Sequence, residues 1–521
     1  MSKRPALIPL LALAALLTFS GCRHTATPSS TVTFLIESSP TNLDPRIGID
    51  AQSQHIDELL FDGLVTRDSH FNFSPAVSDS WQQPDPLTLR FHLRSGVRFH
   101  SGAPLTSADV AFTLDSMRDG TIVSPRAATF AALRSIETPD PATVILHLSH
   151  PDNFLLANLA RGALGIVPAG SGRDFWQHPV GSGPFRFVSQ EVDKEVLLTR
   201  NPDYWDPAPE PPSGTSLIHS LRFAVVPDGI TRALELRKGS ADIASNAIQA
   251  DALPVLAREP HLAVLSTPGT IVQYLAFNTV DPTLRDPRIR QAIACSIDRE
   301  LIRTTLLGSR AQLALSLLPA AHWAYTADVP RYAYDPARAR RLLDSAGRTP
   351  DAHGIRLHLT MKTSTDEGTR LLAATLQQQL AQVGIDLQIR SYETATFLQD
   401  LTRGSFQLYS LRWIGGNEQP DIFSYAFSSS RIPPKGANRG RYRNPTLDHL
   451  LDDAAAQPDQ AIRHADYLQA QQILATDLPA LPLWYSDSVL VANRRLANLT
   501  PSPSGSYTFL TAATLTITPL P

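Results

Sequence analysis

Residues 412–423 read RWIGGNEQPDIF and combine side chains that could bind another molecule. An aromatic ring can stack on an apolar group, a glycine pair lets a ligand approach the backbone, and an amide and a carboxylate can bind polar groups. The residues concerned are Trp413, Gly415, Gly416, Asn417 and Glu418. The segment follows a strand that we predict from Ser405 to Leu411. It forms either a tight turn or part of a binding-site wall, and the local sequence alone favours the turn.

Signatures of catalysis and of metal binding are missing from the sequence. It contains no HExxH, CxxC, GxSxG or Walker phosphate loop, and its 15 histidines are scattered without ligand-like spacing. The glycine-rich stretch GSGPF, Gly181 to Phe185, is followed by neither a lysine nor a helix. It therefore predicts a structural turn and not a phosphate cradle. We expect no enzyme activity, no catalytic residue, no metal site and no cofactor.

The first thirty residues have the pattern of an export signal. Lys3 and Arg4 precede an apolar run from Ala6 to Phe19, which is too short to span a bilayer comfortably. The run ends in FSGC, which resembles a bacterial lipobox that would make Cys22 the lipidated first residue of the mature chain. Ordinary signal cleavage with a leftover cysteine is the alternative. We predict a signal peptide over residues 1–22 and a flexible tether over 23–30.

Length and composition indicate a large, folded, exported chain. Its 521 residues correspond to about two to four structural units. Hydrophobic residues make up 43% and charged residues 18%, so a large core is available. The net charge of −3 gives no basic surplus for binding nucleic acid. Besides Cys22 only Cys295 is present, so we expect no disulfide framework, and Cys295 is predicted to be a buried apolar residue on a helix.

Helix and strand patterns alternate along the mature chain and predict an α/β fold. Residues 31–37, 143–148 and 271–278 read as strands, and residues 53–60 and 106–117 as helices. YDPARARRLLDSAG has Asp335 as a helix cap, Pro336 at the first helical position and Gly347 as the terminator. A βαβαβ rhythm over residues 350–413 predicts a mixed or parallel sheet covered by helices.

An ordered set of motifs resembles the extracytoplasmic solute-binding proteins of family 5, the dipeptide, oligopeptide and nickel type. The set comprises SSPTNLDP, LLFDGLVTRD, LTLRFHLRSGVRFHSGAPLTSADVAFTL, PVGSGPFRF, RNPDYWD, RALELRKGSADI, YLAFNT…LRDPRIRQAIACSIDRELI and YDPARARRLLDSAG. Each motif is weak alone, but together they cover about residues 31 to 500 in the expected order. The resemblance implies the substrate-binding component of an ATP-binding-cassette (ABC) importer.

The same resemblance implies the architecture of a type II periplasmic-binding-protein clamp. Two lobes would be joined by two hinge strands, near Ile271–Asn278 and Leu481–Tyr485. Lobe I would comprise residues 31–270, with an inserted α/β subdomain over about 75–180, and would be completed by the C-terminal return, 486–521. Lobe II would comprise residues 271–485. A ligand bound between the lobes would favour their closure.

The resemblance also implies where a ligand would bind. In peptide binders of the family, an aspartate after the tryptophan equivalent to Trp413 pairs with the peptide ammonium. Here that position holds Gly416, and Glu418, two residues further on, is the candidate substitute; Asp421 matches the Asp of the family's Pro-Asp pair. Without a substitute, the solute would lack a free amine. Four other residues could contact the ligand or could equally have a structural role such as turn capping: Asn42, Gln52, Tyr274 and Asn278. Residues 439–443 form a basic loop that either is solvated or pairs with a carboxylate of the ligand.

These observations predict a lipid-anchored, monomeric binding protein of the periplasm or cell surface. It would capture a small solute, a dipeptide or oligopeptide, and deliver it to a permease and ATPase complex. The alternatives are the same clamp for a non-peptide solute, such as a sugar, an opine or a metal chelate, and an anchored hydrolase. The export signal and the absence of an N-terminal helix-turn-helix argue against a transcription regulator.

Overall fold

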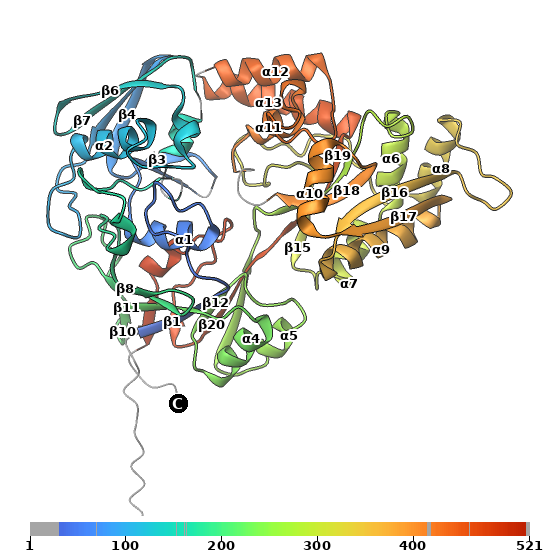
Figure 1. Cartoon of the computed structure of the whole chain (residues 1–521). Coiled ribbons are helices and arrows are strands. Elements are labelled where there is room, and N and C mark those ends of the chain that lie inside the picture. Colours follow the sequence, from blue (N-terminus) through green and yellow to red (C-terminus); the bar gives the residue numbers. More distant parts are fainter. Residues whose placement is uncertain are drawn as a thin grey trace, which may run out of the picture.

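The computed structural model describes residues 31–68, 70–152, 154–160, 162, 164–413, 418–457 and 459–516. Two large sheets each form the centre of a lobe, and the lobes stand side by side (Figure 1). We call the part built on the seven-stranded sheet lobe I and the part built on the six-stranded sheet lobe II. This is the α/β fold that the sequence pattern predicts, in the two-lobed arrangement that the family resemblance implies.

Lobe I is centred on a strand, β1, that is buried on both faces. Val32, Phe34 and Ile36 point into one apolar cluster while Leu35 points into another, because successive side chains of a strand face opposite sides. Strand β1 pairs in parallel with β11 and β12. The sheet order is β13-β20-β12-β1-β11-β9-β8. Its strands are β1 (Thr31–Ile36), β8 (Phe185–Glu191), β9 (Glu195–Arg200), β11 (Ser220–Val225), β12 (Ile243–Ser245), β13 (Leu262–Thr267) and β20 (Ser488–Asn493).

Three helices and two small sheets complete this part of lobe I. Asp228 accepts a hydrogen bond from the backbone of Thr231 and so caps α4. The helices are α1 (Ala51–Leu60), α4 (Gly229–Lys238) and α5 (Leu253–Leu256). The small sheets are formed by β2 (Val65–Arg67) with β3 (Phe73–Pro75), and by β10 (Thr215–Leu217), β22 (Thr514–Thr516) and β21 (Leu496–Ala497).

A four-stranded antiparallel sheet with its own apolar cluster packs beside this body. The main helix of this subdomain begins with a capping box: Thr106 and Asp109 bond reciprocally at the start of α2. Its strands are β4 (Ser78–Asp85), β5 (Thr88–Leu93), β6 (Leu133–Asp140) and β7 (Thr143–Leu148), and its helices are α2 (Ser107–Arg118) and α3 (Leu155–Asn158). The cluster spans Leu64 to Ile166, which overlaps the segment that we predicted as an insertion.

Lobe II contains a mixed sheet, as the βαβαβ rhythm predicts. Strand β16 pairs in parallel with β17 and β18, whereas β14 runs antiparallel to β18 and β19. The sheet order is β15-β19-β14-β18-β16-β17. Its strands are β14 (Val272–Phe277), β15 (Ala311–Leu313), β16 (Leu357–Ser364), β17 (Ile385–Tyr392), β18 (Leu408–Trp413) and β19 (Ala480–Ser486).

Helices cover both faces of this sheet and form two apolar clusters. Buried Cys295 lies in the first cluster, as expected of an apolar residue. The helices are α6 (Pro287–Ser296), α7 (Arg299–Thr305), α8 (Pro336–Ser345), α9 (Glu367–Ala381), α10 (Thr394–Arg403), α11 (Ile422–Phe427), α12 (Pro445–Ala456) and α13 (Gln460–Asp477). Short 3₁₀ turns lie at Ala127–Phe130, Phe175–Gln177, Ser429–Arg431 and Thr508–Thr511.

The strand before the GGN segment lies further along the chain than predicted. It runs from Leu408 to Trp413 and not from Ser405 to Leu411, because residues 404–406 still belong to the exit from α10. The amide of Asn278 holds that exit by donating to the carbonyl oxygens of Gly404, at 3.2 Å, and Phe406, at 2.8 Å. Trp413 is therefore the last residue of the strand.

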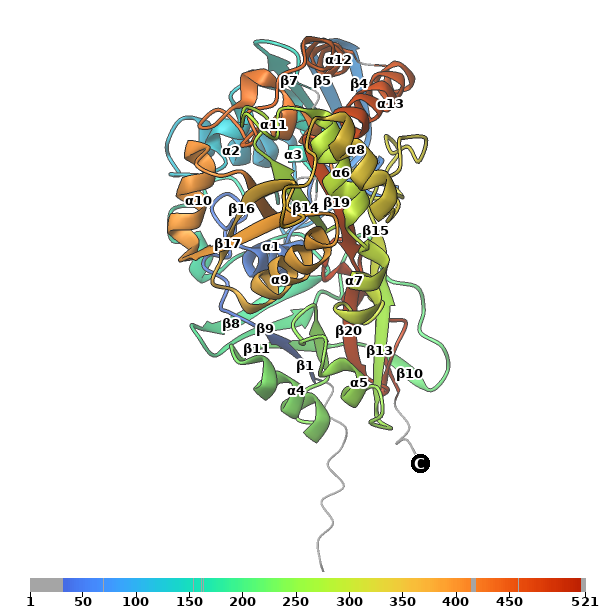
Figure 2. The ribbon, with the colours of Figure 1, turned by 90° about the vertical axis from the view of Figure 1, so that its right-hand side faces the viewer.

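The chain passes between the lobes twice, at neighbouring points. Residues 268–271 lead from β13 of lobe I to β14 of lobe II, and Asp487 separates β19 of lobe II from β20 of lobe I. Figure 2 shows β13 and β20 below β15 and β19 at this junction. The predicted hinge segments correspond to β14 and β19, which lie within the sheet of lobe II, so the crossings fall at their ends.

Candidate functional site

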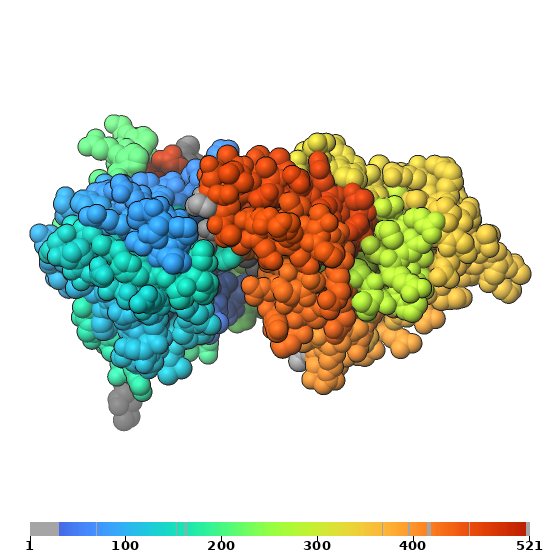
Figure 3. Space-filling model, turned by 90° about the horizontal axis from the view of Figure 1, so that it is seen from above, coloured from blue at the N-terminus to red at the C-terminus, as the bar shows by residue number. Residues whose placement is uncertain are grey.

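The two lobes face each other across a hollow that is visible from above, and α12 and α13 meet lobe I along one side of it (Figure 3). A polar cavity of about 250 Å³ lies at this junction. Residues from lobe I and one residue of lobe II line it together: Glu58, Thr66, Arg67, Asp68, Phe71, Glu418, Ser502, Pro503, Ser504, Ser506 and Thr508. This volume is just below the range of roughly 300–1,000 Å³ that is usual for small-molecule sites.

An ion pair joins the lobes at the edge of this cavity. Arg67, the last residue of β2, places Nη1 3.1 Å from Oε2 of Glu418, and the side chains are 23% and 17% exposed. The hydroxyl of Thr270, in the crossing segment, donates to Oε1 of Glu418 at 3.3 Å. Burial raises the pKa of Glu418, and the positive charge of Arg67 opposes that rise. Glu418 is thus held at the contact between the lobes.

Helix α1 contributes two more titratable side chains. Asp50 caps the helix by accepting from the backbone of Ser53 at 2.9 Å, which fixes the first turn. His55 and Glu58 then lie three residues apart on the same helix face, with 4.0 Å between His55 Nδ1 and Glu58 Oε2. The hydroxyl of Ser506 donates to Glu58. Burial lowers the pKa of His55 to about 4, so the ring is neutral at neutral pH.

Trp413 leads from the sheet of lobe II towards Glu418. Its ring stacks on Tyr274, with 6.0 Å between centroids and 19° between planes, and meets Tyr425 edge-on at 6.1 Å. Tyr274 itself is only 4% exposed and belongs to an apolar cluster of lobe II. Tyr274 therefore packs against the tryptophan within lobe II, and Trp413 itself is partly buried.

Several predicted site residues make bonds within their own lobe. Asn42 accepts from the backbone of Asp44 at 2.9 Å, which forms a local turn. Gln52 accepts from the hydroxyl of Tyr507 at 3.0 Å. Asn278 holds the exit of α10, at the opposite end of β14 from Trp413. For Asn42, Gln52 and Asn278, these hydrogen bonds are those expected of a structural role, the alternative to ligand contact.

Of the remaining predicted residues, only Asp421 lies in the described part of the chain. Gly415, Gly416, Asn417 and the predicted lipidation residue Cys22 lie outside the described residues. Asp421 precedes α11, and its Oδ1 is buried without a hydrogen-bond partner among the described residues. Burial and the nearby negative charge of Asp152 raise its pKa, although Arg431 and Arg463 oppose the rise.

Sequence reasoning missed the lobe I half of the cavity. Arg67 stands in the quoted motif LLFDGLVTRD, but nothing local distinguishes it from a solvated arginine at a strand end. Residues 502–508 form a serine- and proline-containing loop without any periodic pattern. Both segments become recognisable only because the fold places them opposite Glu418.

A second, mostly apolar cavity of about 190 Å³ adjoins the polar one at the crossing segments, and Phe71 and Pro503 line both. The ring of Phe71 stacks on His322 of lobe II, with 5.6 Å between centroids. His70 Nδ1 lies 3.4 Å from the carbonyl oxygen of Ala321, also of lobe II. Lobe I thus touches lobe II at the edges of this cavity as well.

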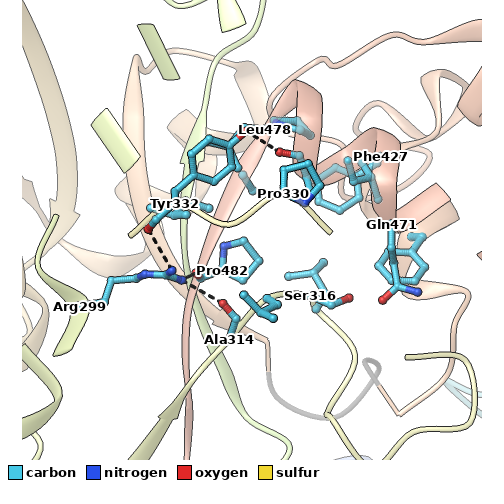
Figure 4. A pocket seen from close by; sticks show the side chains of 17 residues that line it. Arg299, Ala314, Ser316, Pro330, Tyr332, Phe427, Gln471, Leu478 and Pro482 are labelled. Carbon is cyan, nitrogen blue, oxygen red and sulfur yellow. Dashed lines mark hydrogen bonds between the residues drawn. The ribbon is translucent and has the colours of Figure 1, made fainter. Parts of the chain in front are cut away.

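Another pocket lies wholly inside lobe II (Figure 4). Its volume of about 40 Å³ has room for a few water molecules at most. Arg299 points into its wall and donates to the carbonyl oxygens of Ala314, at 2.9 Å, and Pro482, at 2.8 Å. The arginine joins β19 to the neighbouring loop, and the pocket is too small for a solute.

Two classes of feature are not found in the described part of the chain. None of its helices is both long enough and apolar enough to cross a membrane. None of its groups of histidine, cysteine, aspartate and glutamate is arranged to hold a metal ion.

Comparison with known proteins gives consistent results. The model of a family described as bacterial extracellular solute-binding proteins, family 5 middle, matches residues 72–434. Di/tripeptide-binding protein 2 of Pseudomonas aeruginosa is 29% identical over 436 residues, which cover 78% of this chain and 80% of that protein. Two solved structures cover 93% of this chain.

The first solved structure is HbpA2 of Haemophilus parasuis, with 25% identity, 99% of its chain covered and a TM-score of 0.81. The second is the periplasmic binding protein DppA of Helicobacter pylori in complex with the peptide STSA. It is 26% identical, 98% of its chain is covered, and the TM-score is 0.71. The resemblance read from the motifs is therefore confirmed over most of the chain.

Proposed function

Because the chain belongs to the bacterial extracellular solute-binding proteins of family 5, we propose that it captures a short peptide between its lobes and delivers it to an ABC importer. The observation that carries this proposal is the polar cavity at the junction of the lobes, lined from both sides. The similarity of the chain to a di/tripeptide-binding protein, and to a DppA that was solved with a bound peptide, supports a peptide as the solute.

The clamp works by population shift. A solute that contacts Arg67 and the 502–508 loop of lobe I as well as Glu418 and Trp413 of lobe II makes its full set of contacts only when the lobes are together. Shifting the lobes from mostly open to mostly closed requires roughly 5 kcal/mol of difference in binding free energy between the two forms. The paired crossings at residues 268–271 and 487 are short, so the lobes move as bodies about this junction.

The division of the chain follows from this mechanism. Residues 31–270 and 486–521 act as lobe I, and residues 271–485 act as lobe II. The subdomain over about 75–180 accompanies lobe I. A permease that recognises the closed form would bind surfaces of both lobes at the same time.

We retain the segment after Trp413 as part of the ligand site. Trp413 contributes an aromatic surface, and Gly415 and Gly416 allow close approach to the backbone. Asn417 offers an amide, and Glu418 supplies the carboxylate that Gly416 cannot. The position of Glu418 at the cavity, 17% exposed, supports this role. Tyr274 supports the segment from lobe II by stacking on Trp413, and Asp421 remains a candidate ligand contact.

The cellular setting rests on the N-terminal sequence. After export, Cys22 carries the lipid anchor, and residues 23–30 tether the clamp to the membrane surface as a monomer. At about 3.3–3.6 Å per extended residue, this tether holds Thr31 within about 30 Å of the membrane. A clamp at this distance is within reach of a permease in the same membrane.

The decisive experiment is thermal unfolding of the mature chain with a panel of di- to pentapeptides, sugars and metal chelates. A true ligand at 100 times its dissociation constant should stabilise the protein by about 2.7 kcal/mol. The variant Trp413→Ala should weaken the same ligand, whereas Trp81→Ala, in the sheet of the subdomain, should not. Stabilisation by sugars or chelates but by no peptide would reject the peptide assignment.

A further inference from the structure

Phe71 stands at the tip of the hairpin of β2 and β3 in a backbone conformation that is unusual for a bulky residue. Its φ of 65° lies in the left-handed region, which large side chains adopt only where the surrounding structure holds them. Asp68 Oδ1 accepts from the backbone N–H of His70, at 2.8 Å, and of Asn72, at 2.9 Å. The backbone N–H of Phe71 donates to the carbonyl oxygen of Asp68 at 3.0 Å. The turn therefore fixes the direction in which the aromatic side chain leaves the backbone.

The ring of Phe71 is buried against lobe II. Phe71 is only 8% exposed, and its ring stacks on His322 with 5.6 Å between centroids and 24° between planes. Beside this stack, the amide of Gln460, the first residue of α13, donates to Oδ1 of Asn72 at 3.3 Å. Lobe II thus holds the tip of the hairpin, and the ring with it, from the opposite side.

Phe71 and Pro503 form a wall between two cavities at the junction of the lobes. Both residues line the polar cavity of about 250 Å³ and the apolar cavity of about 190 Å³, so they stand between the two. The carbonyl oxygen of Pro503 accepts from the backbone N–H of Thr270 at 3.1 Å, which fixes that half of the wall through the main chain. The other half is the ring of Phe71. This one side chain therefore decides whether the two cavities form a continuous space.

The polar cavity alone has room for a short peptide. A compact space of 250 Å³ is about 8 Å across, and each extended residue spans about 3.3–3.6 Å, so two or three residues fill it. A further residue directed towards the apolar cavity would overlap the ring of Phe71. Displacing the ring would cost its burial and its stack on His322. The wall therefore opposes the binding of longer peptides.

We propose, resting on the proposed function, that Phe71 is the residue that limits the length of the captured peptide. With the ring in place, the clamp accepts dipeptides and tripeptides and excludes longer peptides that would extend into the apolar cavity. Without the ring, the two cavities join and accommodate a tetrapeptide or a pentapeptide. The length limit thus resides in one side chain of lobe I that closes against lobe II.

Titration calorimetry with alanine peptides of two to five residues tests the length limit. These peptides have the same charged termini and uncharged side chains, so length is the variable. The mature, unaltered chain should bind the tetrapeptide and the pentapeptide at least about tenfold more weakly than the tighter of the two shorter peptides. Equal affinity for all four lengths would overturn the proposal while leaving peptide capture intact. If no alanine peptide binds, this inference is rejected, and the proposed function falls with it only when the wider thermal panel also contains no peptide ligand.

Phe71→Gly isolates the contribution of the ring. Glycine adopts a positive φ readily, so the turn should keep its shape when the ring is removed. Loss of the stack on His322 weakens closure for every peptide alike, so the measured quantity is the ratio of tetrapeptide affinity to dipeptide affinity. This ratio should rise about tenfold or more in Phe71→Gly. Phe187→Ala, which removes a partly buried ring of β8 that lines neither cavity, should preserve the ratio.

Phe71→Leu provides a second variant, which keeps an apolar side chain in the wall. Leucine fills less of the wall than phenylalanine, so the ratio should rise by a smaller factor than in Phe71→Gly. An unchanged ratio in Phe71→Gly would overturn the role of Phe71. If thermal unfolding shows that Phe71→Gly is not folded, an unchanged ratio in Phe71→Leu would overturn it in the same way.

Discussion

Arg67 and Glu418 form an ion pair of 3.1 Å that connects the two lobes, although 351 positions separate them in the sequence. Arg67 ends a short strand of lobe I, and Glu418 follows the central sheet of lobe II. The contact lies at the edge of the cavity between the lobes. It is therefore both a link across the cleft and a group that a solute must meet.

Removal of Arg67 should loosen the clamp. Arg67→Met leaves Glu418 with a largely buried charge and no guanidinium partner, which typically costs a few kcal/mol. We expect the ligand-free variant to populate more open forms and to show a larger radius of gyration in solution X-ray scattering. The double variant Arg67→Met/Glu418→Gln should recover part of the compactness, because no unpaired charge remains.

Arg186→Met is a suitable control for this experiment. Arg186 pairs with Asp203 at 2.8 Å within lobe I, and that aspartate is exposed. Arg186 also donates to Oδ1 of Asn201 at 2.7 Å, again within lobe I, so its replacement removes no contact between the lobes. An unchanged radius of gyration in Arg67→Met would show that the ion pair does not hold the lobes together.

Stability should fall as the pH drops below neutrality. Burial lowers the pKa of His55, His100 and His322 from 6.5 to about 4. The unfolded chain therefore takes up protons at these sites near pH 6.5 while the folded chain does not, so stability is present above pH 6.5 and is lost between 6.5 and 4. Asp57 and Glu418, whose pKa values burial raises, act in the opposite direction and reduce the net slope.

The contribution of His322 can be isolated by substitution. Its side chain is 3% exposed, so its shift corresponds to roughly 3 kcal/mol between neutral and acidic pH. Urea unfolding at pH 7 and pH 4.5 should show a smaller difference for His322→Gln than for the unaltered chain. His353→Gln, on an exposed loop, should leave the difference unchanged. Equal differences in all three proteins would contradict the prediction.

Gly181 should tolerate no side chain. A Cβ atom there would lie 1.8 Å from the carbonyl oxygen of Leu60 and 2.8 Å from the ring of Phe61. The glycine-rich stretch therefore packs against the end of α1, in agreement with the predicted structural role. Gly181→Ala should destabilise the fold by about 1–3 kcal/mol or more, as measured by urea unfolding.

Gly172→Ala provides the matched control, since a Cβ atom at Gly172 would meet no atom within 4 Å and the backbone is not left-handed there. We expect a change within about 0.5 kcal/mol for this variant. If both substitutions had the same small effect, the close approach of residue 181 to α1 would not exist in solution.

Lipidation should depend on Cys22 alone. Incorporation of radiolabelled palmitate by cells that express the full chain should disappear in Cys22→Ala. Cys295→Ala should retain it, because Cys295 is buried in the core of lobe II. Labelling that persists in Cys22→Ala would reject the lipid anchor and favour ordinary signal cleavage.

Local signals in the sequence were reliable where a few neighbouring residues decide the structure. The cap at Asp335 accepts from the backbone of Arg338 at 2.8 Å, and Gly347 adopts the left-handed conformation that ends this region. The helix predicted over residues 106–117 is also present, and the capping box of Thr106 and Asp109 starts it. Each of these features is set by hydrogen bonds or dihedral preferences within about four residues, so the sequence contains the necessary information.

Strand limits were less predictable because distant residues contribute to them. The strand after α10 begins at Leu408 because Asn278, from another part of lobe II, holds the backbone at Gly404 and Phe406. The same asparagine was a candidate for ligand binding, and its periodic position in a strand could not show that its amide is already engaged. Side-chain partners that lie more than a hundred residues away leave no local pattern.

The sequence by itself determined the class of elements, since helices and strands depend on periodicity and on local chemistry, and its ordered motifs carried the resemblance to the family, which implied the two-lobed plan. Only the tertiary structure decided which polar groups face the cleft. It brought Arg67, Glu58 and the 502–508 loop to Glu418 around one polar cavity. The physical reason is that burial and charge pairing are properties of the three-dimensional neighbourhood, which chain segments hundreds of residues apart create together.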